Sequence, residues 1–346
     1  MDGVVKMSAA DRRLACVQAE ERLGLQAASI EKDFWVCWTL RELASLQDLG
    51  EHLTFKGGTS LSKAWKLIDR FSEDIDLVVD RDTLGFGGDA SPERAPSNAQ
   101  RKKRLEGLIA ACRSWVQERL QPALAERIAE RVSGPHSVRP DPDDEDGQCL
   151  LFEYPGAFRE AEAGYVRPVV KIELGARSDD WPSASHSFAP YLAEALPDIV
   201  PDATVSFRTL AAERTFWEKA MLLHEETYRP ADKPRAIRMA RHYYDLWCLI
   251  IRGVAEKAAV EEELFKRVAE HRQAFFRWSW VDYDTLRRGA LRLLPHDGQL
   301  AAWRQDYDAM SGPMFFGEVP SFDDILKIVG DFERRFNEGR AGNTTP

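Results

Sequence analysis

Paired cysteines and long apolar runs are scarce in this chain. Its 346 residues include five cysteines, which lie far apart and form no C-x-x-C pair. This usage argues against a disulfide framework or a zinc site and fits a reducing cytosol. No apolar run approaches the roughly 20 residues that cross a bilayer, and the N-terminus lacks the apolar core of a signal peptide. The sequence therefore predicts a cytoplasmic protein that does not enter a membrane.

An excess of basic residues is missing as well. The chain has 57 acidic and 47 basic residues, a net charge of −10 and a pI near 5.4. That balance argues against broad, sequence-independent nucleic-acid binding, which needs a basic surface, but leaves room for a local basic patch. A hydrophobic content of 44% is ordinary for a globular protein with a sizeable core, and the length allows one large or two ordinary domains.

The most informative chemistry lies in one stretch, from Phe55 to Asp80. It begins with a Gly-Gly turn, continues as a predicted helix over residues 60–69 and ends in a predicted strand over 74–79. Asp74 and Asp76 share one face of that strand, because side chains alternate along a strand. Adjacent carboxylates repel each other, and a cation such as Mg²⁺ removes that cost while keeping room for water and phosphate oxygens. The alternative is a solvated strand end.

The turn before this strand has the features of a phosphate site. Gly57 and Gly58 let backbone N–H groups approach an anion without an intervening Cβ. Thr59 and Ser60 add hydroxyls at the start of the helix. Lys63, one turn further on, is the cation we expect to reach phosphate. Together with the two aspartates, this order predicts a metal–nucleotide site.

Charged residues on the flanking predicted helices have two interpretations each. Glu31, Lys32 and Asp33 follow Ser29, a plausible N-cap of a helix over 29–48, and form either a charged first turn or, through Lys32 or Asp33, part of the nucleotide site. The basic run 101–104 opens a predicted amphipathic helix over 101–133. It is either a solvated helix end or a contact for an RNA backbone.

Residues 82–148 interrupt the predicted core with a Gly- and Pro-rich loop, that long helix and an acidic loop over 134–148. Two predicted strands follow, Cys149–Tyr154 and Tyr165–Leu174, as a hairpin. Glu173 shares a strand face with Lys171 and faces away from the apolar positions. It is either a third metal ligand beside the two aspartates or a solvated residue on an edge strand.

From residue 209 onward the pattern is helical, and the sequence predicts a domain boundary there. Lys219 lies beside the apolar stripe of a predicted helix over 209–226, so we expect it to point at an anionic group. Asp245 lies among aromatic residues of a predicted helix over 237–252 and needs a partner, either Lys219 or Arg241. Asp245 forms either a salt bridge between helices or part of a catalytic site.

Several blocks resemble one family. FKGGTSLSKAWKLIDRFSEDIDL resembles the signature of the AbiEii/AbiGii abortive-infection nucleotidyltransferase toxins, within the polymerase-beta-like nucleotidyltransferase superfamily. IEKDFWVCWTLREL, EKAMLLH, RHYYDL and PSFDDILKIVGDFERRFN are similar to further blocks of that family, in the same order. The resemblance spans about residues 29–337 and is most specific in the Gly-Gly to Asp-x-Asp block.

The resemblance implies an α+β fold, in which a nucleotidyltransferase core with a mixed sheet precedes a C-terminal helical domain and NTP and Mg²⁺ bind between them. The expected organisation is a catalytic domain over 1–208 with an 82–148 insertion, a helical domain over 209–338 and a disordered tail over 339–346. Gly57, Gly58, Thr59 and Ser60 would hold the triphosphate, and Asp74 and Asp76 the metal. Lys219 and Asp245 match a lysine and an aspartate that are considered essential in the family.

The expected activity is transfer of a nucleotide from NTP to an acceptor, most directly the 3′ end of tRNA, by the toxin of a toxin–antitoxin or abortive-infection system. Nucleotidylation of a protein or a small molecule is the alternative within catalysis, and a non-catalytic nucleotide-binding module is the alternative outside it. His242, where many relatives have an acidic residue, and the 82–148 insertion leave the acceptor open. Ser72, two residues before Asp74, is a candidate for modification by the protein itself.

Overall fold

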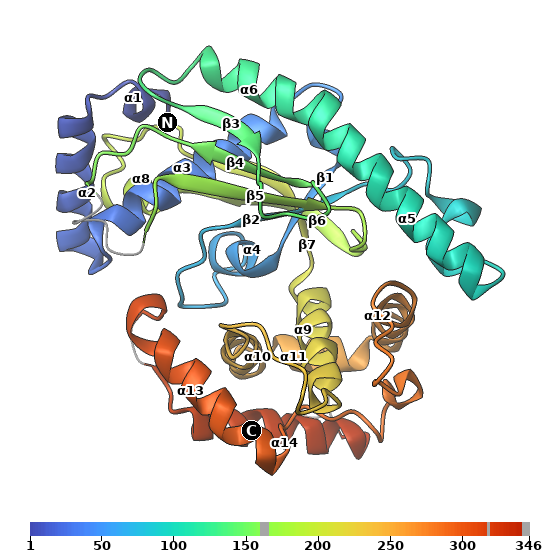
Figure 1. The fold of residues 1–346 in the computed structure, drawn as a ribbon. Coiled ribbons are helices and arrows are strands. Elements are labelled where there is room, and N and C mark those ends of the chain that lie inside the picture. The colour runs from blue at the N-terminus through green and yellow to red at the C-terminus, as the bar shows by residue number, and fades with distance from the viewer. Residues whose placement is uncertain (160–165, 317–318, 341–346) are drawn as a thin grey trace. The chain divides into compact units, whose positions relative to one another are not determined.

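The computed structural model describes residues 1–159, 166–316 and 319–340, which form two compact units (Figure 1). Unit 1 comprises Met1–Ala64 and Phe71–Leu210. Unit 2 comprises Trp65–Arg70 and the described residues from Ala211 onward. Of the tail predicted over 339–346, residues 341–346 lie outside the described residues.

Unit 1 is built on a mixed seven-stranded sheet with the order β3-β4-β5-β2-β1-β7-β6. Two neighbouring pairs, β2 with β5 and β1 with β7, are parallel, and the other pairs are antiparallel. The strands are β1 Leu53–Lys56, β2 Ile75–Val79, β3 Ser137–Pro140, β4 Cys149–Glu153, β5 Val169–Gly175, β6 Ser183–Phe188 and β7 Val205–Leu210. The chemically interesting strand β2 is therefore central, and its apolar residues are buried in the core.

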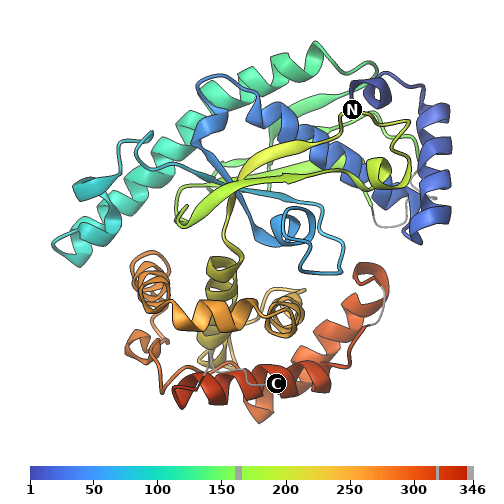
Figure 2. The same cartoon turned by 180° about the vertical axis from the view of Figure 1, so that it is seen from behind.

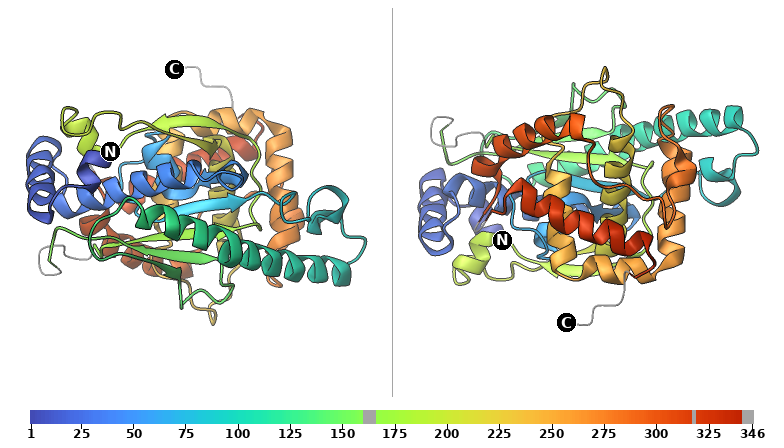
Figure 3. Two further views of the ribbon diagram at one scale, coloured as in Figure 1. Left: turned by 90° about the horizontal axis from the view of Figure 1, so that it is seen from above. Right: turned by 90° about the horizontal axis from the view of Figure 1, so that it is seen from below.

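Helices cover this sheet. They are α1 Asp2–Val5, α2 Ala9–Leu23, α3 Ala27–Ala44, α4 Gly57–Lys63, α5 Asn98–Trp115, α6 Gln121–Ala129 and α8 Tyr191–Ala195. A π-helical turn, Val116–Leu120, joins α5 to α6. Helices α3, α5 and α6 lie over one face of the sheet, and α4 lies on the other side (Figures 2 and 3).

Helix α3 is the core helix of unit 1. Its tryptophans pack on strand β4 and on the residue that follows this strand. The Trp35 ring contacts Phe152 of β4 edge-on, with centroids 5.9 Å apart, and stacks on Tyr154, with centroids 5.2 Å apart. Trp38 completes the cluster, and none of its surface is exposed. Such aromatic pairs add specific stabilisation to the burial of apolar area.

The predicted start of α3 at Ser29 was wrong, and the charged residues expected in its first turn lie one turn further along the helix. Gln26 is the N-cap, so Ser29 lies inside the helix. Glu31, Lys32 and Asp33 are buried, because each has a partner of opposite charge: Arg12 Nε lies 2.8 Å from Glu31, Lys32 Nζ 3.2 Å from Glu73, and Lys63 Nζ 2.8 Å from Asp33. Burial of a charge requires such pairing.

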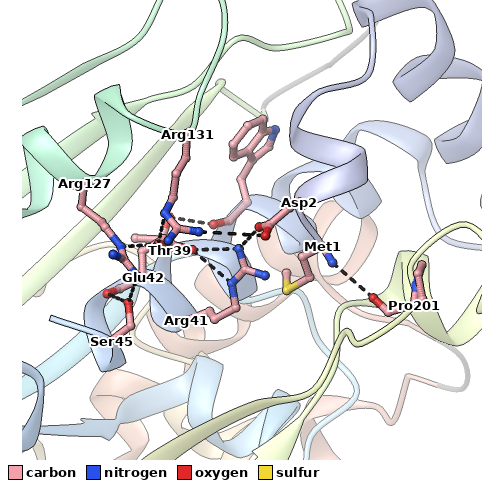
Figure 4. A network of polar contacts seen from close by, with 10 residues as sticks. Met1, Asp2, Thr39, Arg41, Glu42, Ser45, Arg127, Arg131 and Pro201 are labelled. Carbon is pink, nitrogen blue, oxygen red and sulfur yellow. Dashed lines mark hydrogen bonds and ion pairs between the residues drawn. The ribbon is translucent and has the colours of Figure 1, made fainter.

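A polar network fastens the N-terminus, α3 and α6 (Figure 4). The buried Glu42 carboxylate contacts Arg41 at 2.8 Å, Arg127 at 2.9 Å and Arg131 at 3.3 Å. Arg41 also pairs with Asp2. These contacts are structural and tie the long helix of the 82–148 insertion to the core helix.

The insertion is more ordered than the sequence indicated. The predicted helix over 101–133 appears as α5, the π-helical turn and α6, and begins earlier, where the Ser97 hydroxyl accepts from the backbone N–H of Gln100. The acidic loop 134–148 contains the edge strand β3, which was not predicted. Strands β6 and β7 were not predicted either, whereas β4 and β5 confirm the predicted antiparallel pair.

The helix predicted over 60–69 ends at Lys63. Lys66 has φ +53°, a left-handed conformation that cannot continue an α-helix. The residues after it join unit 2 instead: Arg70 forms a β-bridge with Phe315, and the Asp69 carbonyl accepts from the Tyr244 hydroxyl at 3.2 Å. The apolar residues that predicted a longer helix, such as Ile68, are therefore buried as part of unit 2 and do not extend α4.

Unit 2 is helical apart from its connections. Its helices are α9 Ala212–Thr227, α10 Arg241–Ile251, α11 Val254–Val260, α12 Glu262–Phe275, α13 Asp297–Met314 and α14 Phe322–Asn337. Trp217 of α9 packs against Phe265 of α12 and Phe336 of α14, with ring centroids 4.7 and 5.0 Å apart. An α+β class, with a mixed sheet followed by C-terminal helices, is thereby confirmed.

The helix predicted over 237–252 begins only at Arg241. Arg238 has φ +63°, and the Asp306 carboxylate accepts from the backbone N–H groups of Arg238 and Ala240 at 2.6 and 2.8 Å. Because the side chain of Asp306 satisfies these donors, the chain holds a turn where the apolar period indicated a helix. In the described part of the chain, no helix combines the length and apolarity needed to cross a bilayer.

Candidate functional site

Gly57 and Asp76 meet at the start of α4. Gly57 has φ +78°, and a Cβ added to it would lie 2.0 Å from Asp76 Oδ2. Any side chain at position 57 would therefore be strained in its backbone and would displace the carboxylate. The structure thus places the predicted glycine turn directly against the second predicted metal ligand.

The strand register brings further charged residues to the same row of the sheet. Lys56 of β1 is opposite Asp76 of β2, and Asp76 is opposite Glu173 of β5. The residues one position earlier, Ile75 and Ile172, are likewise partners and are fully buried. Since alternate side chains point to opposite faces, Asp76 and Glu173 share the face away from that part of the core.

Asp74 lies one residue before β2, in an environment that disfavours its charge. Burial, followed by the neighbouring carboxylates of Glu173 and Glu73, raises the pKa of Asp74 to about 6, although Lys32 and Lys171 act in the opposite direction. Glu173 is thus close enough to Asp74 to repel it. A cation placed beside these carboxylates would offset their mutual repulsion.

Glu173 is held by Lys171. The Lys171 ammonium lies 3.1 Å from Glu173 Oε1 and 3.2 Å from Asp141 Oδ2. In this arrangement the described residues include no group of three or more His, Cys, Asp or Glu side chains that could hold a metal ion as they stand. Completion of a three-carboxylate site would require Glu173 to leave Lys171, so its role as a ligand stays a prediction.

The hydroxyls of the turn are used internally. Thr59 Oγ1 donates to the Asp74 carbonyl at 2.5 Å and lies 2.9 Å from Ser72 Oγ, and Ser60 Oγ donates to the Gly57 carbonyl at 2.9 Å. Thr59 and Ser60 are fully buried. They therefore fix the turn and the position of Asp74, and this leaves backbone N–H groups as the candidate anion donors.

Lys63 has a structural environment. Its ammonium forms the buried ion pair with Asp33 and lies 3.5 Å from the centroid of the Tyr191 ring. The Asp33 carboxylate also accepts from the Tyr191 backbone N–H at 2.7 Å. In the structure these contacts of Lys63 join α4 to α3 and so support the fold. A contact between Lys63 and phosphate stays a prediction.

The two candidate residues of unit 2 are brought together. Lys219 Nζ of α9 lies 2.8 Å from Asp245 Oδ2 of α10. Lys219 is one of the two partners that the sequence predicted for Asp245. Arg70 adds a bidentate pair, with Nε 2.6 Å from Oδ1 and Nη2 2.8 Å from Oδ2. Asp245 and Arg70 are buried and Lys219 is 8% exposed.

This cluster has one cation in excess. Burial raises the pKa of Asp245, but Arg70 and Lys219 outweigh it and hold the pKa well below its ordinary value. Burial lowers the pKa of Lys219, with Asp245 opposing. Burial also lowers the pKa of the adjacent His242 well below its ordinary value, so this imidazole adds no charge near pH 7. A fully hydrogen-bonded carboxylate with a low pKa is a poor general base and a good positioning group.

Sequence reasoning missed Arg70 and the function of Lys171. Arg70 was not among the predicted site residues, and its only local signal is a cation directly before Phe71 in an apolar segment. Lys171 was predicted to share a strand face with Glu173, but its ion pair with Glu173 was not predicted, although the i, i+2 spacing could have indicated it. Lys102 and Lys103 of the basic run 101–104 are exposed, as either interpretation of that run requires.

Comparisons with known proteins now supplement this geometry. A sequence model of the family described as "Nucleotidyl transferase AbiEii toxin, Type IV TA system" matches residues 38–328. No curated protein matches the chain. A solved structure, the nucleotidyltransferase toxin MenT4 of Mycobacterium tuberculosis H37Rv, is 17% identical, with 96% of this chain and 94% of that chain covered and a TM-score of 0.42. This structural likeness is too weak to carry an argument.

The pKa of Asp74 predicts a pH-dependent gain in stability. At pH 7 without divalent cations, the ionised carboxylate costs the folded state about 2–3 kcal/mol, the equivalent of a shift from 3.8 to about 6. Asp74→Asn should therefore raise the free energy of unfolding at pH 7. The gain should shrink as pH falls from 6 to 4, where the folded wild-type protein binds the proton.

Urea unfolding in EDTA at pH 7 and pH 4.5 measures this difference. The exposed Asp198, in the same unit, gives a matched control as Asp198→Asn. An Asp74→Asn gain that is absent at pH 7, or equal at both pH values, would contradict the stated environment of Asp74.

Asp245→Ala should destabilise unit 2 by about 3–5 kcal/mol, because Arg70 and Lys219 would remain buried without a counter-charge. Asp323→Ala, which removes an exposed partner of Arg304, should cost less than about 1 kcal/mol. Chemical denaturation of both variants provides the test. Equal costs for the two substitutions would show that the buried cluster does not depend on Asp245.

Proposed function

The chain belongs to the family of AbiEii nucleotidyltransferase toxins of type IV toxin–antitoxin systems, and from this premise we propose that it transfers a nucleoside monophosphate from NTP to the 3′ end of tRNA, with Mg²⁺ as cofactor. The chain is a nucleotidyltransferase by its family. The metal, the acceptor and the roles of single residues are the proposed part.

The observation that carries the proposal is the contact between the Gly57 backbone and the Asp76 carboxylate. It joins a turn that can present backbone N–H groups to an anion with a carboxylate that can hold a cation. An NTP–metal complex has both charges, with the metal on the phosphate oxygens. A turn and a carboxylate in contact are therefore suited to such a substrate.

The donor set fits a hard divalent cation. Asp74 and Asp76 would hold it, and Glu173 would join them after release from Lys171. The elevated pKa of Asp74 is the property expected of a carboxylate group that awaits a cation. When bound, a divalent ion lowers the pKa of an attacking hydroxyl and screens the charge of the triphosphate.

The glycine turn would hold the triphosphate. Gly57 and Gly58 would supply backbone N–H groups, because the hydroxyls of Thr59 and Ser60 are committed to backbone carbonyls. These two hydroxyls would act by fixing the turn. This assignment narrows the expected role of Thr59 and Ser60 from direct binding to positioning.

Lys219 and Asp245 would act as a pair. The excess positive charge of the Arg70–Asp245–Lys219 cluster is suited to neutralise a phosphate, an electrostatic contribution to the transition state. Asp245 would orient Lys219, and its low pKa disfavours the alternative role as a base. An antitoxin partner follows from the family, while a role in phage abortive infection and a cytoplasmic location are further parts of the proposal.

Purified protein incubated with each labelled NTP, total tRNA and Mg²⁺ tests the proposal directly. We expect label in tRNA, its loss in EDTA, and a reduction of at least about 100-fold in Asp76→Asn. Asp198→Asn, an exposed carboxylate of the same unit, should retain full transfer.

The competing acceptors give distinct outcomes in the same experiment with cell lysate added. Label in protein bands or in small molecules alone would contradict the tRNA acceptor. The net charge of −10 is the property of this chain that weighs against an RNA acceptor. Full transfer by Asp76→Asn would contradict the metal site. No transfer to any acceptor would favour a non-catalytic nucleotide-binding module.

A further inference from the structure

A tryptophan pair in unit 2, with Trp278 exposed and Trp280 half-buried, has no role in the proposed chemistry. Trp278 is 42% exposed, and its ring stacks on that of Trp280 with centroids 4.9 Å apart and an angle of 15° between the planes. The pair follows α12 in the chain. The backbone N–H of Trp278 donates a hydrogen bond to the Tyr283 hydroxyl at 3.1 Å. The exposed ring of Trp278, stacked on a second indole, offers a flat aromatic face to a ligand.

Guanidinium groups lie over the ring of Trp280 and over the ring of the neighbouring Tyr228. The Arg229 guanidinium carbon lies 5.7 Å from the centroid of the Trp280 ring, and that of the exposed Arg292 lies 5.4 Å from the Tyr228 ring. Tyr228 and Arg229 are adjacent in sequence, which links the two contacts. Alternation of aromatic and cationic groups is typical of surfaces that bind single-stranded nucleic acids.

A cavity of about 360 Å³ continues from Arg229. Its charged lining comes from three cations, Arg229, Lys233 and Arg235, and one carboxylate, Asp306. Its apolar lining includes Ile237, which is 81% exposed. The volume lies at the lower end of the roughly 300–1,000 Å³ of ligand pockets. We call Arg229, Lys233, Arg235, Trp278 and Trp280 the tryptophan–arginine surface.

This surface is held in place from within. The buried Glu226 carboxylate binds Arg229 at 2.7 Å and Arg235 at 3.1 Å, and the Arg235 guanidinium lies 3.8 Å from the centroid of the buried Trp303 ring. One carboxylate thus fixes two arginines and leaves a positive charge in excess. Lys233 is exposed at the rim.

The local charge contrasts with that of the whole chain. The segment 229–241 has five basic residues and one acidic residue in a protein of net charge −10. This segment connects α9, which carries Lys219, with α10, which carries Asp245. A concentration of positive charge at this connection is unexpected on an acidic protein unless it meets an anion.

We propose that the tryptophan–arginine surface binds unpaired nucleotides of an RNA acceptor, with bases stacked on Trp278 and phosphates at Lys233 and Arg229. The inference rests on the proposed RNA acceptor and adds the residues that contact it. Stacking on an indole suits any base, and the cations follow the backbone, so the surface selects single strands without selecting a sequence.

Fluorescence anisotropy with a labelled single-stranded RNA octamer and a blunt RNA hairpin tests this surface in the full-length protein. Trp278→Ala should weaken octamer binding about 5- to 100-fold, the loss of one stacked base, and leave hairpin binding unchanged. Trp278→Phe should restore much of the affinity. Lys233→Glu should weaken binding and reduce its dependence on salt.

Matched controls exist for both changes. Trp181, 41% exposed in unit 1, serves for the tryptophan as Trp181→Ala. Lys266, an exposed lysine of α12, serves for the charge as Lys266→Glu. If Trp278→Ala and Lys233→Glu bind the octamer like these controls, the surface does not bind RNA and the inference is overturned. The same holds if Trp278→Ala loses only the binding of a protein such as the antitoxin.

Transfer assays separate this inference from the proposed function. If wild-type protein binds the octamer through Trp278 but never labels RNA, the proposed acceptor is wrong and the surface stands. If wild-type protein labels RNA and Trp278→Ala has an unchanged KM for RNA, the proposed function stands and the surface is rejected.

Discussion

The close approach of the Gly57 backbone to the Asp76 carboxylate is the constraint on which the proposed site depends. Gly57 adopts φ +78° at the end of β1, and its missing side chain leaves the space that Asp76 fills. Thr59 then fixes the carbonyl of Asp74, so one turn positions both aspartates. The central location of β2 in the mixed sheet adds Glu173 in the same register row. The proposed anion donors and cation ligands are thereby assembled from local structure within unit 1.

Buried charges divide into those that are neutralised and those that are not. The Asp33–Lys63 pair and the Glu42 network balance their charges and support the helices around the sheet. Asp74 has no such balance, and the Arg70–Asp245–Lys219 cluster has one surplus cation. Uncompensated charge is costly in a folded protein unless a ligand compensates it. The proposed function uses each of these two places for a charged ligand, whereas balanced pairs such as Lys63 with Asp33 support the fold.

The sequence predicted the features that depend on local spacing. Alternation along β2 and β5 identified Asp76 and Glu173 as facing away from the core. The apolar surroundings of Asp245 predicted a cationic partner, Lys219 or Arg241, and the structure has Lys219 there. Features set by distant contacts were not predictable. Residues 65–70 do not continue α4 because Arg70 and Asp69 bind residues of unit 2. The helix predicted over 237–252 begins only at Arg241 because Asp306 holds the preceding residues in a turn. Glu31 looked like a surface residue because its partner Arg12 is 19 positions away.

Titration of Mn²⁺ into the metal-free protein, followed by the loss of free Mn²⁺ signal in electron paramagnetic resonance, tests the central claim most directly. A Cβ at position 57 would displace the Asp76 carboxylate, whereas one at Gly3 meets nothing within 4 Å. We expect Gly57→Ala and Asp76→Asn to weaken Mn²⁺ binding at least about tenfold, as expected when a ligand or its support is lost, and Gly3→Ala to bind like wild type. Unchanged Mn²⁺ affinity in both Gly57→Ala and Asp76→Asn would contradict the proposed site.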